Sequence, residues 1–312
     1  MIDPSSNPGD VGYTVSTTDY FSARASRYEM SQAHIQFLDI PKLTTRDQQH
    51  SHLDIDGLLK RLISINPISL HQDVQARRLP GTGEWFIESA VFKQWVIPQA
   101  QQVLLCQGIP GAGKTTITSL VIDILEDRIH GTKSGMAYLY FDTQSWSDCS
   151  VSHAISSLLV QLLRRNGDRV SADLAARLTR LGDDDSGNPT LNTLLDLFEE
   201  AARLVQDSPI FVILDALDSL PLGVLSGLLE CIRRLAGKVP NLKLFATSNW
   251  GLEHDFKDHF DSYLSLEIRA HDRDIRHYLQ HKIRSLPSLG NRLDPELMDR
   301  IVNVGADAAD GM

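Results

Sequence analysis

Short apolar runs alternate with longer segments of helical periodicity over the last two thirds of the chain. The apolar runs predict five strands, at 102–107, 136–142, 210–215, 242–248 and 263–268. Apolar residues that recur every three or four positions predict helices between them, at 113–129, 150–167, 191–207 and 222–240. Regular alternation of strands and helices predicts an α/β fold, with a parallel sheet covered by helices on both faces.

The flanking regions have different patterns. The first 50 residues are rich in Ser, Thr, Asp and Gln and poor in aliphatic residues, which predicts a mostly disordered leader. Helical periodicity predicts further helices at 52–65, 86–96, 272–286 and 295–304. The expected organisation is a leader, a helical linker, a core and the start of a further helical region, at 1–50, 51–98, 99–270 and 271–312.

Composition and charge narrow the function classes. The 312 residues are 42% hydrophobic and 22% charged, with a net charge of −10. An acidic chain is a poor candidate for gripping nucleic acid, because phosphate binding needs a basic surface. No apolar run approaches the roughly 20 residues that span a bilayer, and the first residues lack the features of a secretory signal. The three cysteines show no metal-ligand spacing. We therefore expect an intracellular, cytoplasmic protein that binds neither nucleic acid nor membrane.

The segment GIPGAGKTT, at 108–116, carries the clearest chemistry. It matches the pattern G-x-x-x-x-G-K-[ST] between a predicted strand and a predicted helix. Its glycines let backbone N–H groups curl around a phosphate, Lys114 reaches the β- and γ-phosphates, and the Thr115 hydroxyl binds Mg²⁺. The alternative is a glycine-rich turn that binds nothing. The candidate nucleotide-binding residues here are Gly108, Gly111, Ala112, Gly113, Lys114, Thr115 and Thr116.

Two aspartates follow the apolar run IFVIL. Asp215, at the carboxyl end of the predicted strand, suits a carboxylate that holds Mg²⁺ through water, together with Thr115. The alternative is a strand-end aspartate that caps a turn. Asp218 polarises an attacking water or supports the ligands from behind, or else it is a turn or cap residue ahead of the following helix. The candidate catalytic residues are therefore Lys114, Asp215 and Asp218.

A further predicted strand ends in Thr247 and Ser248. In many ATPases such a polar tip senses the γ-phosphate, although ordinary strand-end residues are the alternative. The guanine-binding pattern N-K-x-D is not found, which favours ATP over GTP. The predicted cofactors are thus ATP or ADP, with Mg²⁺.

An ordered series of motifs runs from about Arg77 to Met312: RLPGTGEWFIES, LLCQGIPGAGKTT, MAYLYFD, FVILDALDSLP, LKLFATSNW, LEIRAHDRDIRHYL and ADGM. This series resembles the fungal NACHT-type P-loop NTPases with a nephrocystin 3-like N-terminal domain. The resemblance implies a STAND-class nucleotide switch with strand order 5-1-4-3-2. It also implies a closed ADP form, a homo-oligomer formed through the NTPase domain with ATP, and a role in signal transduction and heterokaryon incompatibility.

The chain departs from this family at two charged positions. The glutamate of D-A-L-D-E is Ser219, and the arginine of T-S-R is Asn249. These changes remove an acid that positions water and a cation that reads the γ-phosphate, so the resemblance implies nucleotide binding with slow hydrolysis. A small-molecule kinase, with Asp142 or Asp148 binding the acceptor, and a nucleotide-free scaffold remain as alternatives.

Two questions stay open at this point. Trp85, in the family motif GTGEW, either packs beneath a nucleotide base or anchors the linker helix to the core. The chain also stops after ADGM, where the family continues into winged-helix and repeat regions, so the sequence does not say whether it is a fragment. Nor does it reveal the upstream signal, the effector, the oligomeric state or the role of the first 50 residues.

Overall fold

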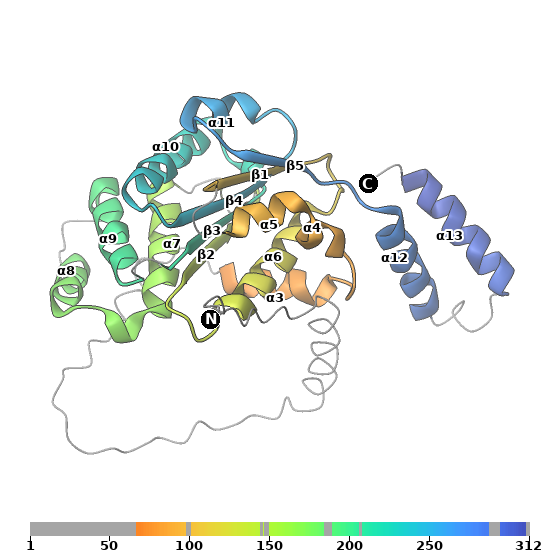
Figure 1. The fold of residues 1–312 in the computed structure, drawn as a ribbon, viewed down its shortest axis with the longest axis horizontal. Helices are drawn as coiled ribbons and strands as arrows, with labels where there is room; N and C mark the ends of the chain where they lie inside the picture. Colours follow the sequence, from red (N-terminus) through yellow and green to blue (C-terminus); the bar gives the residue numbers. More distant parts are fainter. Residues whose placement is uncertain are drawn as a thin grey trace, which may run out of the picture. The chain divides into compact units, whose positions relative to one another are not determined.

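The computed structural model describes most of the chain after residue 66. The described residues are 67–97, 101–143, 146, 150–183, 189–205, 208–286 and 294–309. The strands are β1 (Val103–Gln107), β2 (Gly135–Tyr140), β3 (Ile210–Asp215), β4 (Leu242–Ser248) and β5 (Leu264–Glu267). The α-helices are α3 (Pro67–Arg77), α4 (Glu84–Glu88), α5 (Ala90–Val96), α6 (Lys114–Ile129), α7 (Val151–Arg165), α8 (Ala172–Asp183), α9 (Leu191–Arg203), α10 (Leu222–Lys238), α11 (Glu253–His259), α12 (Asp272–Ser285) and α13 (Pro295–Ala309) (Figure 1). Two 3-10 turns are η1 (Gly167–Arg169) and η2 (Leu217–Ser219).

The five strands form one parallel sheet in the order β2-β3-β4-β1-β5. Read from the other edge, this is the expected order 5-1-4-3-2, so the predicted topology is confirmed. The strand β1 lies between β4 and β5, and β4 separates β1 from β3. The carboxyl ends of β1, β3 and β4 therefore meet at one edge of the sheet. The glycine-rich loop, Asp215 and Thr247 all follow or end these strands.

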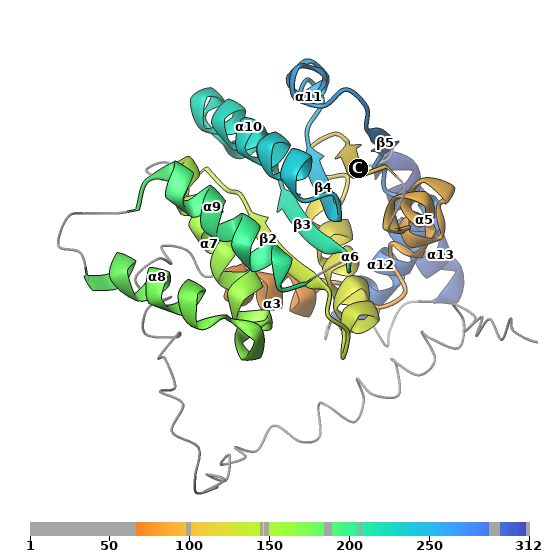
Figure 2. The ribbon, with the colours of Figure 1, turned by 60° about the vertical axis from the view of Figure 1, so that its left-hand side comes forward.

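Helices cover both faces of the sheet, with α7, α9 and α10 on one side and α5 and α6 on the other (Figure 2). Every residue of β1 to β4 is buried. Burial on both faces explains why these strands appear in the sequence as continuous apolar runs rather than as alternating patterns. The edge strand β5 is only half-buried.

Several elements differ from the sequence prediction. The helix expected at 86–96 is two helices, because the Ser89 side chain accepts a hydrogen bond from the Phe92 N–H and caps a new helix, α5. The predictions for 1–50 and 52–65 lie outside the described residues. The structure adds three helices that the periodicity did not indicate, namely α3, α8 and α11.

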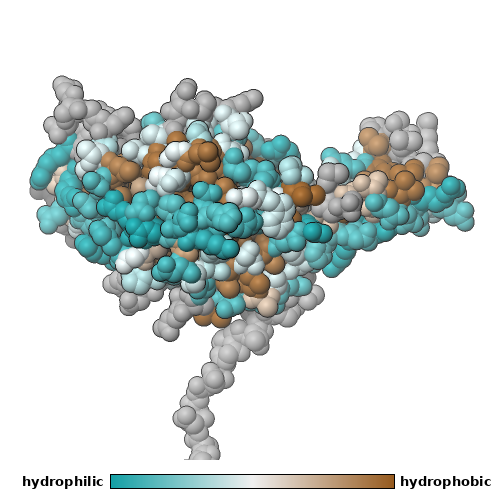
Figure 3. All heavy atoms as spheres, turned by 90° about the horizontal axis from the view of Figure 1, so that it is seen from above, coloured by the Kyte–Doolittle hydropathy of each residue, from teal (hydrophilic) through white to brown (hydrophobic). Residues whose placement is uncertain are grey.

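The surface is mostly polar, with scattered apolar patches (Figure 3). Large exposed apolar side chains occur on loops, at Ile109 and Trp250, and at the first residue of α10, Leu222. Others lie on α12 and α13, at Tyr278, Leu297, Ile301 and Val304. Of the described residues, none belongs to a helix long and apolar enough to cross a membrane.

Lys243 in β4 is fully buried at the amino end of the sheet, far along the strand from the carboxyl edge. Its Nζ donates hydrogen bonds to the carbonyl oxygens of Ile97, at 2.7 Å, and Gln101, at 3.2 Å. These bonds fasten the connection between α5 and β1. Burial lowers the pKa of Lys243 from 10.5 to about 8.

This pKa gives the stability a pH dependence. Between pH 8 and 10 the unfolded chain binds more protons at Lys243 than the folded chain does, so stability rises with pH. In wild-type protein the free energy of unfolding should rise by about 2 kcal/mol between pH 7.5 and 9.5 because of Lys243. We expect the Lys243→Met variant to lose this rise. Urea denaturation at both pH values measures it. The exposed Lys257→Met variant is the control, and equal pH slopes in both variants would contradict the prediction.

Candidate functional site

The loop between β1 and α6 presents backbone donors to the carboxyl edge of the sheet. Gly111 and Gly113 have φ angles of 86° and 90°, where side chains other than glycine are strained. Gly113 is the N-cap of α6, and a Cβ added there would meet no atom within 4 Å. The first N–H groups of α6 have no partners within the helix and mark its positive end. The space beside Gly113 is therefore open, and the start of α6 next to it is suited to an anion.

Gly108 is needed for a second reason, which the sequence did not indicate. A Cβ at Gly108 would lie 2.2 Å from the carbonyl oxygen of Ile268, just after β5. The Ile268 N–H in turn donates to the Gln107 carbonyl at 2.6 Å. The backbone that leads from β5 to α12 thus crosses directly over the start of the loop.

The Lys114 side chain folds back onto this loop. Its Nζ donates to the carbonyl oxygens of Gly108, at 2.8 Å, and Ile109, at 2.9 Å. Its third acceptor is the Asn249 Oδ1, at 2.7 Å. Partial burial lowers the Lys114 pKa, while the nearby carboxylates oppose that shift. All three donors of the ammonium group are therefore bonded within the protein, two of them to the loop itself.

Asp215 is 2% exposed and accepts hydrogen bonds from three hydroxyl groups. The Thr115 hydroxyl is 2.7 Å from Oδ2, and those of Thr118 and Thr247 are 2.6 and 2.7 Å from Oδ1. Burial raises the Asp215 pKa, and the three hydroxyls and Lys114 counteract this. The structure thus brings together Thr115 and Asp215, as the metal-site prediction requires. Thr118 was missed, although its place one helical turn after Thr115 puts it on the same face.

The backbone turns sharply after Asp215. Ala216 has φ 58° and ψ 50°, in the left-handed region, which is uncommon for a residue other than glycine. Its N–H donates to the Thr247 hydroxyl at 2.9 Å, which holds the turn. Strained backbone of this kind gathers at functional sites, and here it directs η2 so that Asp218 faces the end of β4.

Asn249 bridges Asp218 and Lys114. Its backbone N–H and its Nδ2 donate to the two Asp218 carboxylate oxygens, at 2.8 and 2.6 Å. The amide orientation is fixed by chemistry, because an ammonium group only donates hydrogen bonds and a carboxylate only accepts them. The residue that the resemblance marks as a lost cation is therefore a neutral link between the two charged candidates.

This arrangement excludes one alternative for Asp218, that it caps the following helix. Pro221 is the N-cap of α10 and contributes no side-chain hydrogen bond, so Asp218 does not cap that helix. Ser248 is buried, with its hydroxyl 3.5 Å from the Gln107 Nε2. At the end of β4, Thr247 contacts Asp215 and Ser248 contacts Gln107, while Asn249, the next residue, contacts Lys114.

The remaining candidates fit around this centre. Ala112 is buried beneath the loop and Thr116 is half-buried in the first turn of α6. Trp85 stacks on His271 just before α12, with ring centroids 4.3 Å apart and planes at 9°. The stack joins α4 to the residue that precedes α12, which lies outside the predicted 99–270 core.

The residues fit a magnesium–phosphate ligand. The Thr115 hydroxyl and the Asp215 carboxylate are hard oxygen donors of the kind that Mg²⁺ prefers, and the loop N–H groups with Lys114 suit phosphate oxygens. No group of three or more His, Cys, Asp or Glu side chains that could hold a metal occurs among the residues that the structure describes.

A strand, a glycine-rich loop and a helix at the carboxyl edge of a parallel 2-3-4-1-5 sheet define the P-loop NTPase fold. The family model described as "Nephrocystin 3, N-terminal" matches residues 81–249, more than half of the chain. The chain therefore belongs to the nephrocystin 3 N-terminal family. No curated protein sequence matches it.

Similar solved structures include three nucleotide-binding or replication proteins. The Orc1 protein of Aeropyrum pernix in complex with DNA is 16% identical, with 81% of this chain and 55% of that chain covered and a TM-score of 0.42. The Walker-type ATPase of Pyrococcus abyssi is 13% identical, with 84% and 66% of the two chains covered and a TM-score of 0.43. The replication initiator DnaA bound to AMPPCP and single-stranded DNA is 12% identical, with 81% and 61% of the two chains covered and a TM-score of 0.37. The chain spans less than two thirds of the length of each. At this level the likeness concerns the fold and carries no functional argument.

Proposed function

We propose that the chain is the Mg²⁺-dependent ATP- or ADP-binding module of a STAND-type signalling switch, with slow hydrolysis. The observation that carries the proposal is the joint placement of Lys114, Thr115 and Asp215 at the mouth of the glycine-rich loop. A nucleotide-free scaffold has no need to place an ammonium group, a hydroxyl group and a buried carboxylate around an open cradle.

Each residue has a distinct part in this function. The loop N–H groups and Lys114 hold the β- and γ-phosphates, while the Thr115 hydroxyl and Asp215 hold Mg²⁺. Mg²⁺ supplies positive charge that neutralises the phosphates when it is bound. Thr118 and Thr247 keep the Asp215 carboxylate oriented through their hydrogen bonds.

Slow hydrolysis follows from the state of Asp218 and its neighbours. Both Asp218 oxygens accept hydrogen bonds from Asn249, which hold the carboxylate against the residue that follows β4. Ser219 and Asn249 carry no charge where the family has an acid and a cation. The site therefore holds a nucleotide with few groups that stabilise the charge of a transition state.

The family resemblance supports the proposed domain bounds, cellular location and signalling role. We assign 99–270 to the NTPase core, 51–98 to a linker and 271–312 to the start of a helical region, in a cytoplasmic signalling protein of the NACHT type. Assembly with ATP through the NTPase domain and a role in fungal heterokaryon incompatibility rest on the resemblance alone. The net charge of −10 favours a protein that does not bind nucleic acid, because phosphate binding needs a basic surface.

Nucleotide binding tests this function directly. We expect wild-type protein to bind ADP and ATP with Mg²⁺, and the Lys114→Ala variant to bind about 30-fold more weakly, because it loses a charged hydrogen-bond donor to the phosphates. Isothermal titration measures both. The exposed Lys257→Ala variant should bind like wild type. Absence of binding to the wild-type protein would favour the scaffold, and rapid phosphoryl transfer to a metabolite would favour a kinase.

A further inference from the structure

Residues 80–85, which we call the 80–85 turn, contact the start of α12 at four points. These contacts do not involve the phosphate loop directly. The Gly83 N–H donates to the Asp274 Oδ2 at 2.8 Å. The other three are the Trp85–His271 stack, the Pro80 carbonyl 3.1 Å from the His277 Nε2, and the Glu84–Arg273 ion pair at 3.8 Å.

The helix α12 has no buried residue, and it lies against α13. A Cβ at Gly305 of α13 would lie 2.8 Å from the Leu279 Cδ1, which shows how closely the two helices approach. The contacts between α12 and the 80–85 turn are instead polar or aromatic. Such contacts hold two elements in one geometry without a large apolar interface, so they can form and break reversibly.

The same turn presses on the phosphate-loop helix. Gly83 is buried with φ +83°, and a Cβ added there would lie 2.9 Å from Ile117 Cδ1 and Leu120 Cδ2 of α6. The peptide that Asp274 holds therefore rests on α6, within two turns of Lys114. A shift of this peptide must be accommodated by the first turns of α6, since packed interiors leave little free space.

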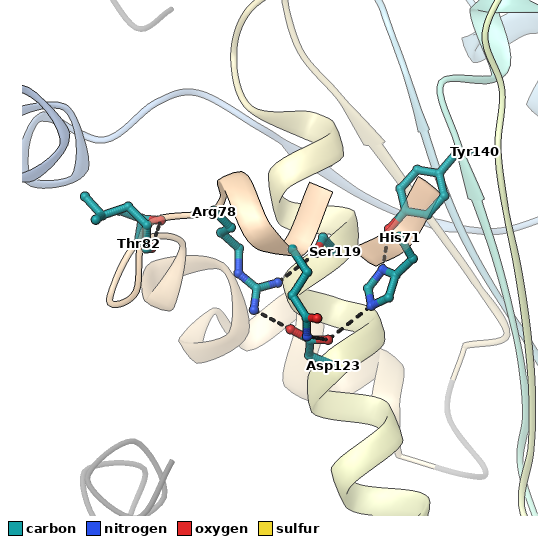
Figure 4. Close-up of polar contacts among 8 residues, drawn as sticks. His71, Arg78, Thr82, Ser119, Asp123 and Tyr140 are labelled. Carbon is teal, nitrogen blue, oxygen red and sulfur yellow. Dashed lines mark hydrogen bonds and ion pairs between the residues drawn. The ribbon is translucent and has the colours of Figure 1, made fainter. Parts of the chain in front are cut away.

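The segment just before the turn is also held to α6. Arg78 donates to the Ser119 Oγ at 2.9 Å and pairs with Asp123 (Figure 4). The Thr82 hydroxyl donates to the Leu79 carbonyl at 2.7 Å and closes the turn on itself. The turn is thus a short rigid segment with α6 on one side and α12 on the other.

We propose that Asp274 is a positioning residue for the nucleotide site. By accepting the Gly83 N–H, it holds the 80–85 turn against α6 and so fixes the start of α6, where the phosphate loop ends. Undocking of α12 then loosens the phosphate loop. The expected change in nucleotide affinity rests on the proposed function. The link from Asp274 through the 80–85 turn to α6 does not, because it concerns the protein alone.

Hydrogen exchange and nucleotide binding together test this role, in a set of matched variants. Asp274→Ala removes the acceptor, while Asp274→Asn keeps an oxygen that accepts the Gly83 N–H. Asp272→Ala removes a carboxylate from the same first turn, but one that pairs with Arg276 on the exposed side. His271→Ala removes the stack on Trp85 and weakens the same interface from a second residue.

In nucleotide-free protein we expect Asp274→Ala to speed amide exchange about tenfold or more at 80–86 and at 113–120. The same variant should weaken MgADP binding about tenfold. His271→Ala should act in the same direction, and Asp274→Asn and Asp272→Ala should stay near wild type.

Three results would overturn the proposal. Faster exchange at 80–86 with unchanged exchange at 113–120 would show that the turn does not act on α6. Equal effects of Asp272→Ala and Asp274→Ala would point to a helix-end charge effect instead. Faster exchange at 113–120 with unchanged MgADP affinity would show that the link has no bearing on the site. Should wild-type protein bind no nucleotide, the proposed function fails by itself, and exchange at 113–120 alone decides the positioning role.

Discussion

Replacement of Asp123 by alanine is expected to lower the free energy of unfolding by about 3–5 kcal/mol. Asp123 lies on α6 and is 4% exposed. It pairs with Arg78 and accepts hydrogen bonds from the Gln75 Nε2, at 2.9 Å, and the His71 Nε2, at 3.2 Å (Figure 4). Without the carboxylate, the Arg78 guanidinium, whose side chain is 11% exposed, remains largely out of water with no counter-charge, and that is the costly outcome. Urea denaturation measures the loss.

The network that surrounds Asp123 joins three elements. The His71 Nδ1 is 2.8 Å from the Tyr140 hydroxyl, which links α3 to β2. Burial raises the pKa of Tyr140, so its phenol stays protonated and can donate to His71. Asp123 then takes the hydrogen bond of the other ring nitrogen. This chain of contacts holds α3, whose apolar burial is limited to Pro67 and Val74, against α6 and β2.

A double variant separates the pair from the packing. If Asp123 matters because it compensates Arg78, then Asp123→Leu combined with Arg78→Met should recover most of the stability that Asp123→Leu loses alone, since both charges are gone. A single-variant loss below about 1 kcal/mol would show that water replaces the carboxylate and that the network contributes little.

The same network explains which parts of the fold the sequence could predict. The strands β1 to β4 are buried on both faces, so their apolar runs identify them. The helix α3 turns toward the core with His71, Val74 and Pro67, and a helix anchored by buried polar contacts leaves no apolar period to detect. Its existence depends on partners such as Asp123, which lie some 50 positions away in the sequence.

The candidate site was predictable for a topological reason. Parallel strands end at one edge, so a loop after β1 and an aspartate at the end of β3 must lie near each other, and Thr115 and Asp215 are 2.7 Å apart. The bridge through Asn249 was not predictable, because it depends on the rotamer and amide orientation of one side chain. The left-handed conformation of Ala216, which turns Asp218 toward Asn249, is equally invisible in the sequence.

The Asn249 bridge leads to the second large effect. A chain that carries both Ser219→Glu and Asn249→Arg is expected to hydrolyse ATP about 100-fold faster or more than wild type, because a suitably placed arginine alone can be worth several orders of magnitude. Steady-state phosphate release with Mg²⁺ measures the turnover. Glutamate at 219 adds an acid to orient water, next to Asp218 in η2.

The present contacts of Asn249 explain why the arginine should help. The backbone N–H of residue 249 would keep its hydrogen bond to Asp218, and a guanidinium group can replace the one that the Asn249 Nδ2 donates. It cannot replace the oxygen that now accepts a hydrogen bond from Lys114. Lys114 would therefore be released from position 249 toward the phosphates, and the new cation would lie beside it, where the charge of the transferred group develops.

Control variants show which substitution raises the turnover. Asn249→Arg alone should give part of the increase in turnover, and Ser219→Glu alone should give a smaller part. Lys114→Ala in the double variant should abolish the increase, which would exclude a contaminating ATPase. Unchanged turnover in the double variant, with MgATP binding intact, would show that neither position limits hydrolysis. The limit would then lie in the geometry of the site, such as the docking of α12, because the charges of the related family would already have been restored.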